Sequence, residues 1–470
     1  MKKNAGYVIA GAASGSGKTT FTLGLMAWLQ KRGYTVAPFK TGPDFIDPGH
    51  HTRITGTASR NLDGWMLSRN YNLDTFFRHA ARADVAVVEG VMGLYDGFDG
   101  ISEAGSTAQM AKWLDLPVIL LVNAASMARS AAALVKGFVE FDTGLRFAGV
   151  VFNNLGSPAH LEYLKEAVNH SLEVPVLGGL LRDERLTIPE RHLGLVTGEE
   201  HVLDQAAIDR LADMIETGLD TDRLTSGLVL SVASFRKKET VPIGPDPVRI
   251  GVARDEAFCF YYQDNLDLLA AHGAELVFFS PITDRHLPAD LAGLYFGGGY
   301  PEVFAEALSA NQTMRDQIYR ACQNGLPIYG ECGGFMYLCR EFVDRDGRRL
   351  PLCGCFPLAT RLLDRLKSLG YREVTLTEDT IMGPAGTTAR GHEFHYSELE
   401  TPASDLPPHI APVYAVSDRG NRTATAEGFR VNQSLASYVH VHFGSNPSLA
   451  GNMVEAGRQY RKSKQTDQPG

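Results

Sequence analysis

A glycine-rich stretch near the start of this chain has the residue types and spacing to bind phosphate. It reads GAASGSGKTT over residues 11–20, follows an apolar run and opens an amphipathic one. Glycines let successive backbone N–H groups point at phosphate oxygens, and the next helix adds its positive end. Five residues separate Gly11 from Gly17, one more than in the standard GxxxxGK[ST] loop, which would place its first glycine at Ala12. We predict nucleotide contacts from Gly15, Gly17, Lys18, Thr19 and Thr20.

A phosphate site also needs acidic residues to hold a metal ion. Glu89 ends an expected strand, while Asp44 and Asp47 follow the preceding one and Asp96 lies in a later loop. Ligands of open α/β sheets collect at the carboxyl ends of the strands, where these acids fall. The pattern suggests Mg²⁺ bound by Thr19, Glu89 and Asp44, with Asp47 and Asp96 near a substrate. Each aspartate taken alone is equally typical of a turn or helix cap.

A second reactive pattern lies in the C-terminal half. Gly330-Glu331-Cys332-Gly333-Gly334 follows a short apolar run and precedes FMYLCREF. This is the cysteine counterpart of the G-x-S-x-G nucleophile elbow, with Cys332 exposed on a tight strand-to-helix turn. The helix N-terminus is expected to lower the pKa of the thiol. We expect Gly298 and Gly299, in an upstream glycine run, and Gly333 to stabilise an oxyanion.

A cysteine nucleophile requires a base, and SYVHVHF supplies His440 and His442. In a continuous strand over 437–443, alternation would put both on one face, so periodicity does not choose between them. His50 and His51 are more typical of turn or core residues than of metal ligands. Cys353 and Cys355 resemble a short redox or metal pair, although such a pair usually has only a structural role.

Two α/β patterns are expected to position these groups. In the first half, strands are predicted at 7–12, 35–40, 85–89, 117–123, 147–153 and 175–179, and helices at 19–31, 106–114, 130–140 and 158–170. Such alternation predicts a parallel sheet covered on both faces. We predict an ATPase domain over 1–233, a linker over 234–247, a second α/β domain over 248–455 and a frayed polar tail over 456–470.

Composition limits the possible partners. A net charge of −9 argues against general nucleic-acid binding, and no apolar run is long enough for a membrane helix. Six cysteines without paired zinc spacing, in an acidic chain without a secretory signal, lead us to expect a cytoplasmic protein with reduced thiols. Oligomeric state is not readable from these features.

Longer motifs resemble the cobyrinic/cobyric acid synthase family over nearly the whole chain. FKTGPDFIDPGHH, NLDGWM and EGVMGLYDG lie in the first half, and GECGGFMYL, ARGHEFHYS and SYVHVHFGSNP in the second. The resemblance implies a dethiobiotin synthetase-like P-loop ATPase followed by a class I glutamine amidotransferase-like domain. It implies Cys332 as nucleophile, His440 as its base two residues after Tyr438, and Asn153 at the adenine. Many class I amidotransferases have an acid where this chain has His442.

The resemblance also implies a reaction. ATP would activate the a and c acetate carboxylates of cobyrinate or hydrogenobyrinate, and L-glutamine would supply ammonia, in cobalamin biosynthesis. Another tetrapyrrole acid, such as a sirohydrochlorin derivative, involves the same residue chemistry. A partitioning-type nucleotide switch would leave the cysteine elbow unused, and a simple glutaminase would leave the phosphate loop unused.

Overall fold

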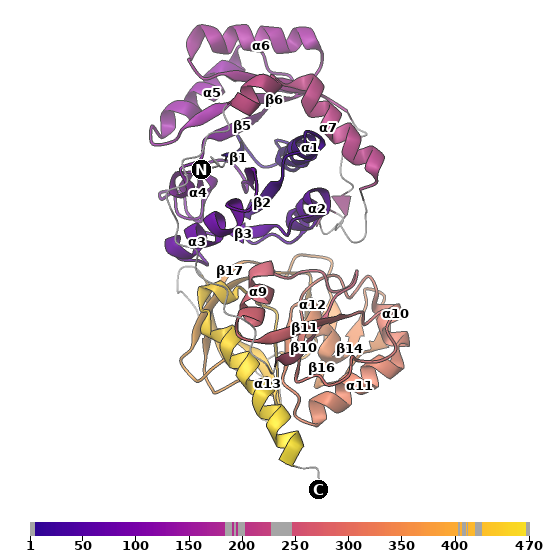
Figure 1. Ribbon diagram of the computed structural model, residues 1–470. Coiled ribbons are helices and arrows are strands. Elements are labelled where there is room, and N and C mark those ends of the chain that lie inside the picture. The colour runs from indigo at the N-terminus through magenta and orange to yellow at the C-terminus, as the bar shows by residue number, and fades with distance from the viewer. Residues whose placement is uncertain are drawn as a thin grey trace. The chain divides into compact units, whose positions relative to one another are not determined.

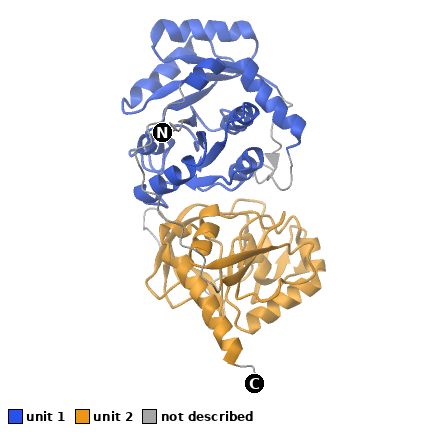
Figure 2. Cartoon of the chain, in the orientation of Figure 1, with its two compact units in different colours: residues 1–238 blue, residues 239–470 orange. Residues whose placement is uncertain are grey.

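The computed structural model describes residues 5–183, 190–191, 194–195, 203–226, 247–402, 405–406, 410, 412–418 and 425–466. The chain divides into two compact units, Met1–Lys238 and Glu239–Gly470 (Figure 2). The predicted linker over 234–247 lies outside the described residues, apart from Pro247. No helix in the described ranges combines the length and apolar character required to span a bilayer.

Unit 1 is built on a parallel sheet of seven strands in the order β3-β2-β4-β1-β5-β6-β7 (Figure 1). The strands are β1 (Ala5–Gly11), β2 (Val36–Thr41), β3 (Arg60–Leu62), β4 (Val85–Glu89), β5 (Val118–Asn123), β6 (Phe147–Leu155) and β7 (Val176–Leu181). The helices are α1 (Lys18–Lys31), α2 (Ile46–Thr55), α3 (Arg69–Ala80), α4 (Thr107–Leu114), α5 (Ser130–Phe141), α6 (Pro158–Ser171), α7 (Gln205–Gly218) and α8 (Thr221–Ser226). A two-stranded ribbon pairs β8 (Glu190–Arg191) with β9 (Gly194–Leu195).

Alternating apolar residues bury both faces of this sheet. On β1, Tyr7 and Ile9 join one core, which includes residues of α1 and α7, while Val8 and Ala10 join the other, with residues of α3 to α6. Strands buried on both faces read as continuous apolar runs because neither face is left for water. The predicted parallel α/β architecture is confirmed, and the six predicted strands match β1, β2 and β4 to β7 to within two residues at each end.

The parallel pairing brings the chemical groups of unit 1 to one edge. β1 ends at Gly11, directly before the phosphate loop, and β2 and β4 end beside it. Lys40 of β2 is in register with Glu89 of β4, and Ile9 of β1 is in register with the same glutamate. The carboxyl ends of three neighbouring strands therefore meet where the acids were expected.

Unit 2 combines a ten-stranded mixed sheet with a smaller sheet of four strands (Figure 1). The large sheet has the order β11-β10-β12-β13-β22-β21-β20-β17-β18-β23, and the small one β15-β14-β16-β19. The strands are β10 (Val248–Ala253), β11 (Ala274–Phe279), β12 (Gly293–Phe296), β13 (Ile328–Glu331), β14 (Cys339–Val343), β15 (Arg349–Pro351), β16 (Phe356–Leu362), β17 (Ser368–Leu376), β18 (Thr388–His395), β19 (Ser397–Leu399), β20 (Pro412–Asp418), β21 (Thr425–Val431), β22 (Ser434–Ser437) and β23 (His440–Val441). The helices are α9 (Gln263–Ala271), α10 (Ala305–Ala310), α11 (Gln312–Gln323), α12 (Gly333–Leu338), α13 (Ser448–Thr466) and the 3₁₀ turn η4 (Phe443–Ser445).

Two sequence expectations for unit 2 are wrong. Residues 456–466 were expected to fray, yet they continue α13. Gly457 is buried, and Arg458 and Arg461 donate to His272 O at 2.9 Å and to Pro247 O at 3.1 Å. The continuous strand expected over 437–443 is broken, because β22 ends at Ser437, beside β13, and the chain then crosses to pair β23 with β18.

Candidate active sites

The phosphate loop has the backbone shape that binds anions. Gly15 and Gly17 have φ values of 74° and 89°, a region that side chains with a Cβ rarely adopt. Asn153 Nδ2 donates to Ser16 O at 3.0 Å, and a Cβ on Gly17 would lie 2.1 Å from that nitrogen. Asn153, predicted at the adenine, therefore braces the loop itself in this structure.

A cavity of about 530 Å³ opens beside the loop. Residues predicted to bind the nucleotide, the metal and the substrate line it, namely Gly15, Gly17, Lys18, Thr19, Thr20, Asp44, Asp47, Glu89 and Asn153. Lys40 also lines it, whereas Asp96 is not among the lining residues. Asp96 Oδ2 instead accepts the N–H of Gly93 at 2.8 Å, which is the turn role that the sequence left open.

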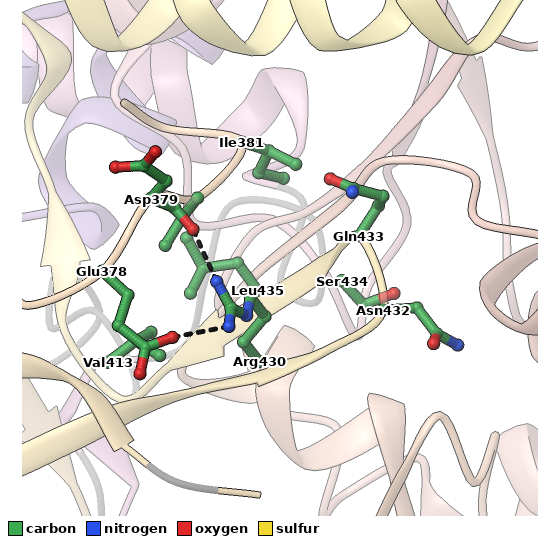
Figure 3. Close-up of a pocket in the computed structure, with 10 residues that line it drawn as sticks. Glu378, Asp379, Ile381, Val413, Arg430, Asn432, Gln433, Ser434 and Leu435 are labelled. Carbon is green, nitrogen blue, oxygen red and sulfur yellow. Dashed lines mark hydrogen bonds and ion pairs between the residues drawn. The ribbon is translucent and has the colours of Figure 1, made fainter. Parts of the chain in front are cut away.

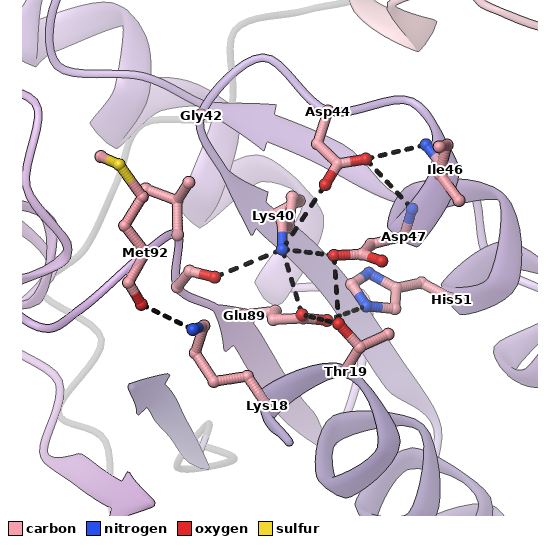
Figure 4. Close-up of polar contacts among 12 residues, drawn as sticks. Lys18, Thr19, Lys40, Gly42, Asp44, Ile46, Asp47, His51, Glu89 and Met92 are labelled. Atoms are coloured by element: carbon pink, nitrogen blue, oxygen red, sulfur yellow. Dashed lines mark hydrogen bonds and ion pairs between the residues drawn. The ribbon is translucent and has the colours of Figure 1, made fainter. Parts of the chain in front are cut away.

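The polar centre of this cavity joins one hydroxyl, one ammonium and two carboxylates (Figure 4). The Thr19 hydroxyl donates to Glu89 Oε1 at 2.8 Å and lies 3.3 Å from Asp47 Oδ2. Lys40 Nζ lies 2.5 Å from Asp47 Oδ2 and 3.0 Å from Glu89 Oε1. Hydroxyl and carboxylate oxygens are the ligands Mg²⁺ prefers, so Thr19, Glu89 and Asp47 fit this ion.

Asp44 is placed differently from Asp47. Its Oδ1 accepts the N–H groups of Ile46 and Asp47 at 2.8 and 3.1 Å, so it caps the start of α2. Its other oxygen lies 3.6 Å from Lys40 Nζ. Asp47, assigned to the substrate from the sequence, therefore contacts the predicted metal ligand Thr19, whereas Asp44, assigned to the metal, caps α2.

Two residues of this cluster were missed or given no role from the sequence. Lys40 ends the apolar run of β2 directly before the acids, and that position was the available signal. His51 was expected only as a turn or core residue, and it is buried, with Nε2 2.7 Å from Glu89 Oε2. Because Nδ1 lies 3.2 Å from the Ser59 hydroxyl, His51 links Glu89 to the protein core.

Lys40 and Glu89 stabilise each other in their charged forms. Burial acts to lower the pKa of Lys40, but the charges of Asp47, Glu89 and Asp44 outweigh it and raise this pKa above its ordinary value. For Glu89, burial acts to raise the pKa, but Lys40, followed by the hydrogen bonds from His51 and Thr19, holds it below the ordinary value. At neutral pH, Lys40 is therefore a cation and Glu89 an anion.

In unit 2, Cys332 occupies a strained turn between β13 and α12. Its φ of 47° and ψ of −104° are uncommon for a residue with a side chain. Gly334 must lack a side chain here, since a Cβ would lie 2.4 Å from Phe296 O. The geometry is that of the nucleophile elbow predicted from the glycine spacing.

Burial works against thiolate formation at this turn. It raises the pKa of Cys332 well above its ordinary value, and the opposing hydrogen bond from the Gly333 N–H is a smaller effect. The expected lowering of this pKa by the helix N-terminus is therefore wrong for this structure. Burial, with the charges that His392 and His395 could carry, also lowers the pKa of His440. The resting pair is a thiol and a neutral imidazole.

The two candidate bases have different surroundings, because His440 lies in β23 and His442 follows the end of this strand. His440 stacks on His392 with ring centroids 5.0 Å apart, and a Cβ on Gly298 would lie 2.2 Å from its Cε1. His442 packs on Tyr262 at 4.4 Å, and its Nδ1 accepts the Gly444 N–H at 3.0 Å to cap η4. His440 therefore adjoins the glycine loop, whereas His442 supports the turn that follows.

The glycine loop that follows β12, residues 297–299, has one free backbone N–H fewer than expected for an oxyanion. The Gly298 N–H donates to Phe260 O at 3.2 Å, so its predicted oxyanion role is wrong for this structure. A Cβ on Gly333 would lie 3.1 Å from Gly299 N, which places the other two predicted donors close together. Gly299 and Gly333 remain the proposed oxyanion donors.

Other features of unit 2 carry none of the predicted chemistry. A cavity of about 510 Å³ lies beside the turn between β21 and β22 and is lined by Glu378, Asp379, Thr380, Ile381, Val413, Arg430, Asn432, Gln433, Ser434 and Leu435 (Figure 3). Arg430 spans it, pairing with Glu378 and donating to Asp379 O. Cys353 and Cys355 are buried and not disulfide-bonded.

Comparisons with known proteins match both units. Residues 7–196 match a family described as the CobQ/CobB/MinD/ParA nucleotide binding domain. Residues 249–448 match the CobB/CobQ-like glutamine amidotransferase domain. The second match explains the cysteine elbow, which a nucleotide switch would not need.

Full-length relatives share one name. The cobyrinate a,c-diamide synthase of Syntrophotalea carbinolica is 47% identical, with 95% of this chain and 97% of the relative covered. Proteins of that name from two strains of Dehalococcoides mccartyi are 44% and 43% identical, each covering 96% of this chain and 98% of the relative. With a nucleotide-binding unit, an amidotransferase unit and relatives of 43–47% identity that cover 95–96% of its length, the chain belongs to the cobyrinate a,c-diamide synthase family.

Proposed function

We propose that this chain converts the a and c acetate carboxylates of cobyrinate, or of hydrogenobyrinate, into amides, with ATP and L-glutamine as co-substrates. The observation that carries the proposal is that one chain holds both required chemistries. Unit 1 has the phosphate loop with Thr19, Asp47 and Glu89, and unit 2 has Cys332 on its elbow with His440 at the neighbouring glycine loop.

The ATP half makes the carboxylate reactive. A carboxylate oxygen of the substrate attacks the γ-phosphorus of ATP, and the bond between this phosphorus and the β,γ-bridging oxygen breaks. The products are ADP and an acyl phosphate. Lys18 and the loop N–H groups position and neutralise the phosphates. Thr19, Glu89 and Asp47 would hold Mg²⁺, which would supply further charge neutralisation. We assign Lys40 to hold these carboxylates in place, because its ammonium bonds to two of them.

The glutamine half releases ammonia. The Cys332 sulfur attacks the carboxamide carbon as its proton moves to His440, and the N–H groups of Gly299 and Gly333 stabilise the oxyanion. His440 returns the proton to the leaving nitrogen, so ammonia departs and a thioester remains. Water hydrolyses the thioester to glutamate and restores the thiol. Ammonia then displaces phosphate from the acyl phosphate, and two rounds use two ATP and two glutamines.

Cys332→Ser tests this division of labour. A hydroxyl is a far weaker nucleophile than a thiol at neutral pH, so glutamine should support no diamide formation. Ammonium salts at alkaline pH with ATP should restore appreciable diamide, because the ATP half is unchanged. Product chromatography with cobyrinate, hydrogenobyrinate and sirohydrochlorin as acceptors also identifies the substrate.

The matched control is Cys259→Ser, which changes a half-buried cysteine outside the elbow and should keep glutamine-dependent synthesis. Full glutamine-dependent synthesis by Cys332→Ser would show that Cys332 is a packing residue. Amidation of sirohydrochlorin in preference to the corrinoids would move the proposal to that substrate.

A further inference from the structure

The segment that carries His440 is held by side chains as well as by strand pairing. The Tyr438 N–H donates to Glu427 Oε1 at 2.7 Å, and the Phe443 N–H donates to Asn265 Oδ1 at 2.7 Å. Between them, the Val441 N–H donates to Glu331 Oε1 at 3.0 Å. Side-chain acceptors therefore hold the segment around the short β23. One of them, Glu331, belongs to β13, the strand that directly precedes Cys332.

Glu331 is the residue directly before Cys332 and ends β13. Its side chain is 1% exposed and accepts three hydrogen bonds. Tyr329 Oη and the Val441 N–H share Oε1, at 2.9 and 3.0 Å, and Tyr295 Oη donates to Oε2 at 3.0 Å. Burial raises the pKa of Glu331 to about 8, although these hydrogen bonds oppose it. A buried carboxyl group is costly, so its presence beside the nucleophile calls for a reason.

We propose that Glu331 is a positioning residue for glutamine hydrolysis, because it ties the backbone next to His440 to the strand that ends at Cys332. The inference rests on the proposed roles of Cys332 and His440. The pattern G-x-C-x-G does not specify this role, since Glu331 occupies the x position before the cysteine. A fixed separation between nucleophile and base matters because a misplacement of about 1 Å can cost roughly a hundredfold in rate.

The test measures glutamine hydrolysis by the full-length protein carrying Glu331→Leu or Glu331→Gln. Leucine fills similar space but cannot accept the Val441 N–H, so kcat should fall by about tenfold to a hundredfold. KM for glutamine should stay within about threefold, because no glutamine-binding group is changed. Glutamine keeps an acceptor oxygen in place of Oε1, so Glu331→Gln should retain kcat within about threefold. ATP-dependent amidation with ammonia should be unchanged in both variants.

Tyr329→Phe is the matched control. It removes a hydrogen bond to the same Oε1, but from within β13, and leaves the bond to Val441 intact. Its kcat should therefore stay near that of the unchanged protein. If Glu331 had a purely structural role, Tyr329→Phe and Glu331→Leu would instead lower kcat by similar factors.

Several results would overturn the inference. The first is an unchanged kcat for glutamine hydrolysis in Glu331→Leu. The second is an equal fall in kcat in Glu331→Leu and Glu331→Gln. The third is an equal fall in kcat in Glu331→Leu and Tyr329→Phe. If Glu331→Leu does not fold, Glu331→Asp replaces it, because aspartate keeps the carboxyl group but falls one methylene short of Val441. Glu331→Asp should have a lower kcat for glutamine hydrolysis and an unchanged KM. An unchanged kcat in this variant would count against the inference. Glutamine hydrolysis by Cys332→Ser would mean that the proposed nucleophile itself is wrong, which separates the two failures.

Discussion

Lys40 places its ammonium group within hydrogen-bonding distance of both Asp47 and Glu89, in the wall of the nucleotide cavity. An ammonium this deeply buried stays charged only when carboxylates compensate it. The same carboxylates face the Thr19 hydroxyl, so one lysine orients the oxygens that are proposed to bind Mg²⁺. Asp47 is the carboxylate whose loss should reveal this arrangement most clearly.

At the residue scale, we predict that Asp47→Asn impairs amidation by on the order of a hundredfold while changing glutamine hydrolysis much less. The substitution replaces the carboxyl partner of Lys40 with an amide and removes a proposed metal ligand, and both effects lie within the ATP half. Diamide formation and glutamate release, measured in the same reaction, give the two rates. Asp44→Asn is the control and should lose less, since its amide oxygen can still cap α2. Near-normal diamide formation by Asp47→Asn would leave Asp47 with only a structural role.

At the scale of elements, the end of β23 at Val441 separates the surroundings of His440 and His442, which lie only two residues apart. His440 starts β23, opposite His392 on β18, while His442 lies beyond this strand and caps η4. Had β23 continued through Phe443, both rings would have faced the same way. Because β23 ends at Val441, His440 lies at the proposed catalytic site and His442 at the turn that follows.

His440→Ala should therefore abolish glutamine hydrolysis, because no base remains to take the thiol proton. His442→Ala should reduce it only several-fold, by loosening η4 and the packing on Tyr262. Glutamate release by each purified variant gives the comparison, and ammonia-dependent amidation shows that the ATP half is intact. The opposite ranking would identify His442 as the base.

At the scale of the whole molecule, each unit has its own sheet, core and reactive edge. The phosphate loop and its acids lie entirely in unit 1, and the cysteine elbow with both histidines lies in unit 2. Two chemistries built on separate cores can be removed one at a time. The amide product then depends on both, whereas each partial reaction depends on one.

Lys18→Ala should stop amide formation with either glutamine or ammonia, because a phosphate contact that strengthens in the transition state is lost. Glutamine hydrolysis at Cys332 should persist. ADP, glutamate and diamide are measured together. Lys31→Ala is the control, since Lys31 is on the same helix but exposed and paired with Asp213, and it should leave all three unchanged. Normal amide formation by Lys18→Ala would rule out the phosphate-loop assignment.

Local spacing by itself determined the two α/β units, the phosphate loop and the elbow at Cys332. Glycines at fixed offsets, between an apolar strand and a helix, specify a backbone turn wherever they occur, and alternating apolar runs specify a sheet. The resemblance of long motifs then pointed to the family that the relatives confirm. These features depend on residues close together in the chain, which a sequence displays directly.

Only the tertiary structure decided which groups meet. Lys40 reaches Glu89 because β2 and β4 are neighbours in register, although the two residues lie far apart in sequence. Gly298 loses its amide to Phe260, and α13 forms where fraying was expected, because each finds partners contributed by distant segments. Such partners satisfy buried hydrogen-bonding groups and apolar faces, and they depend on strand order and packing. Local spacing specifies neither of these.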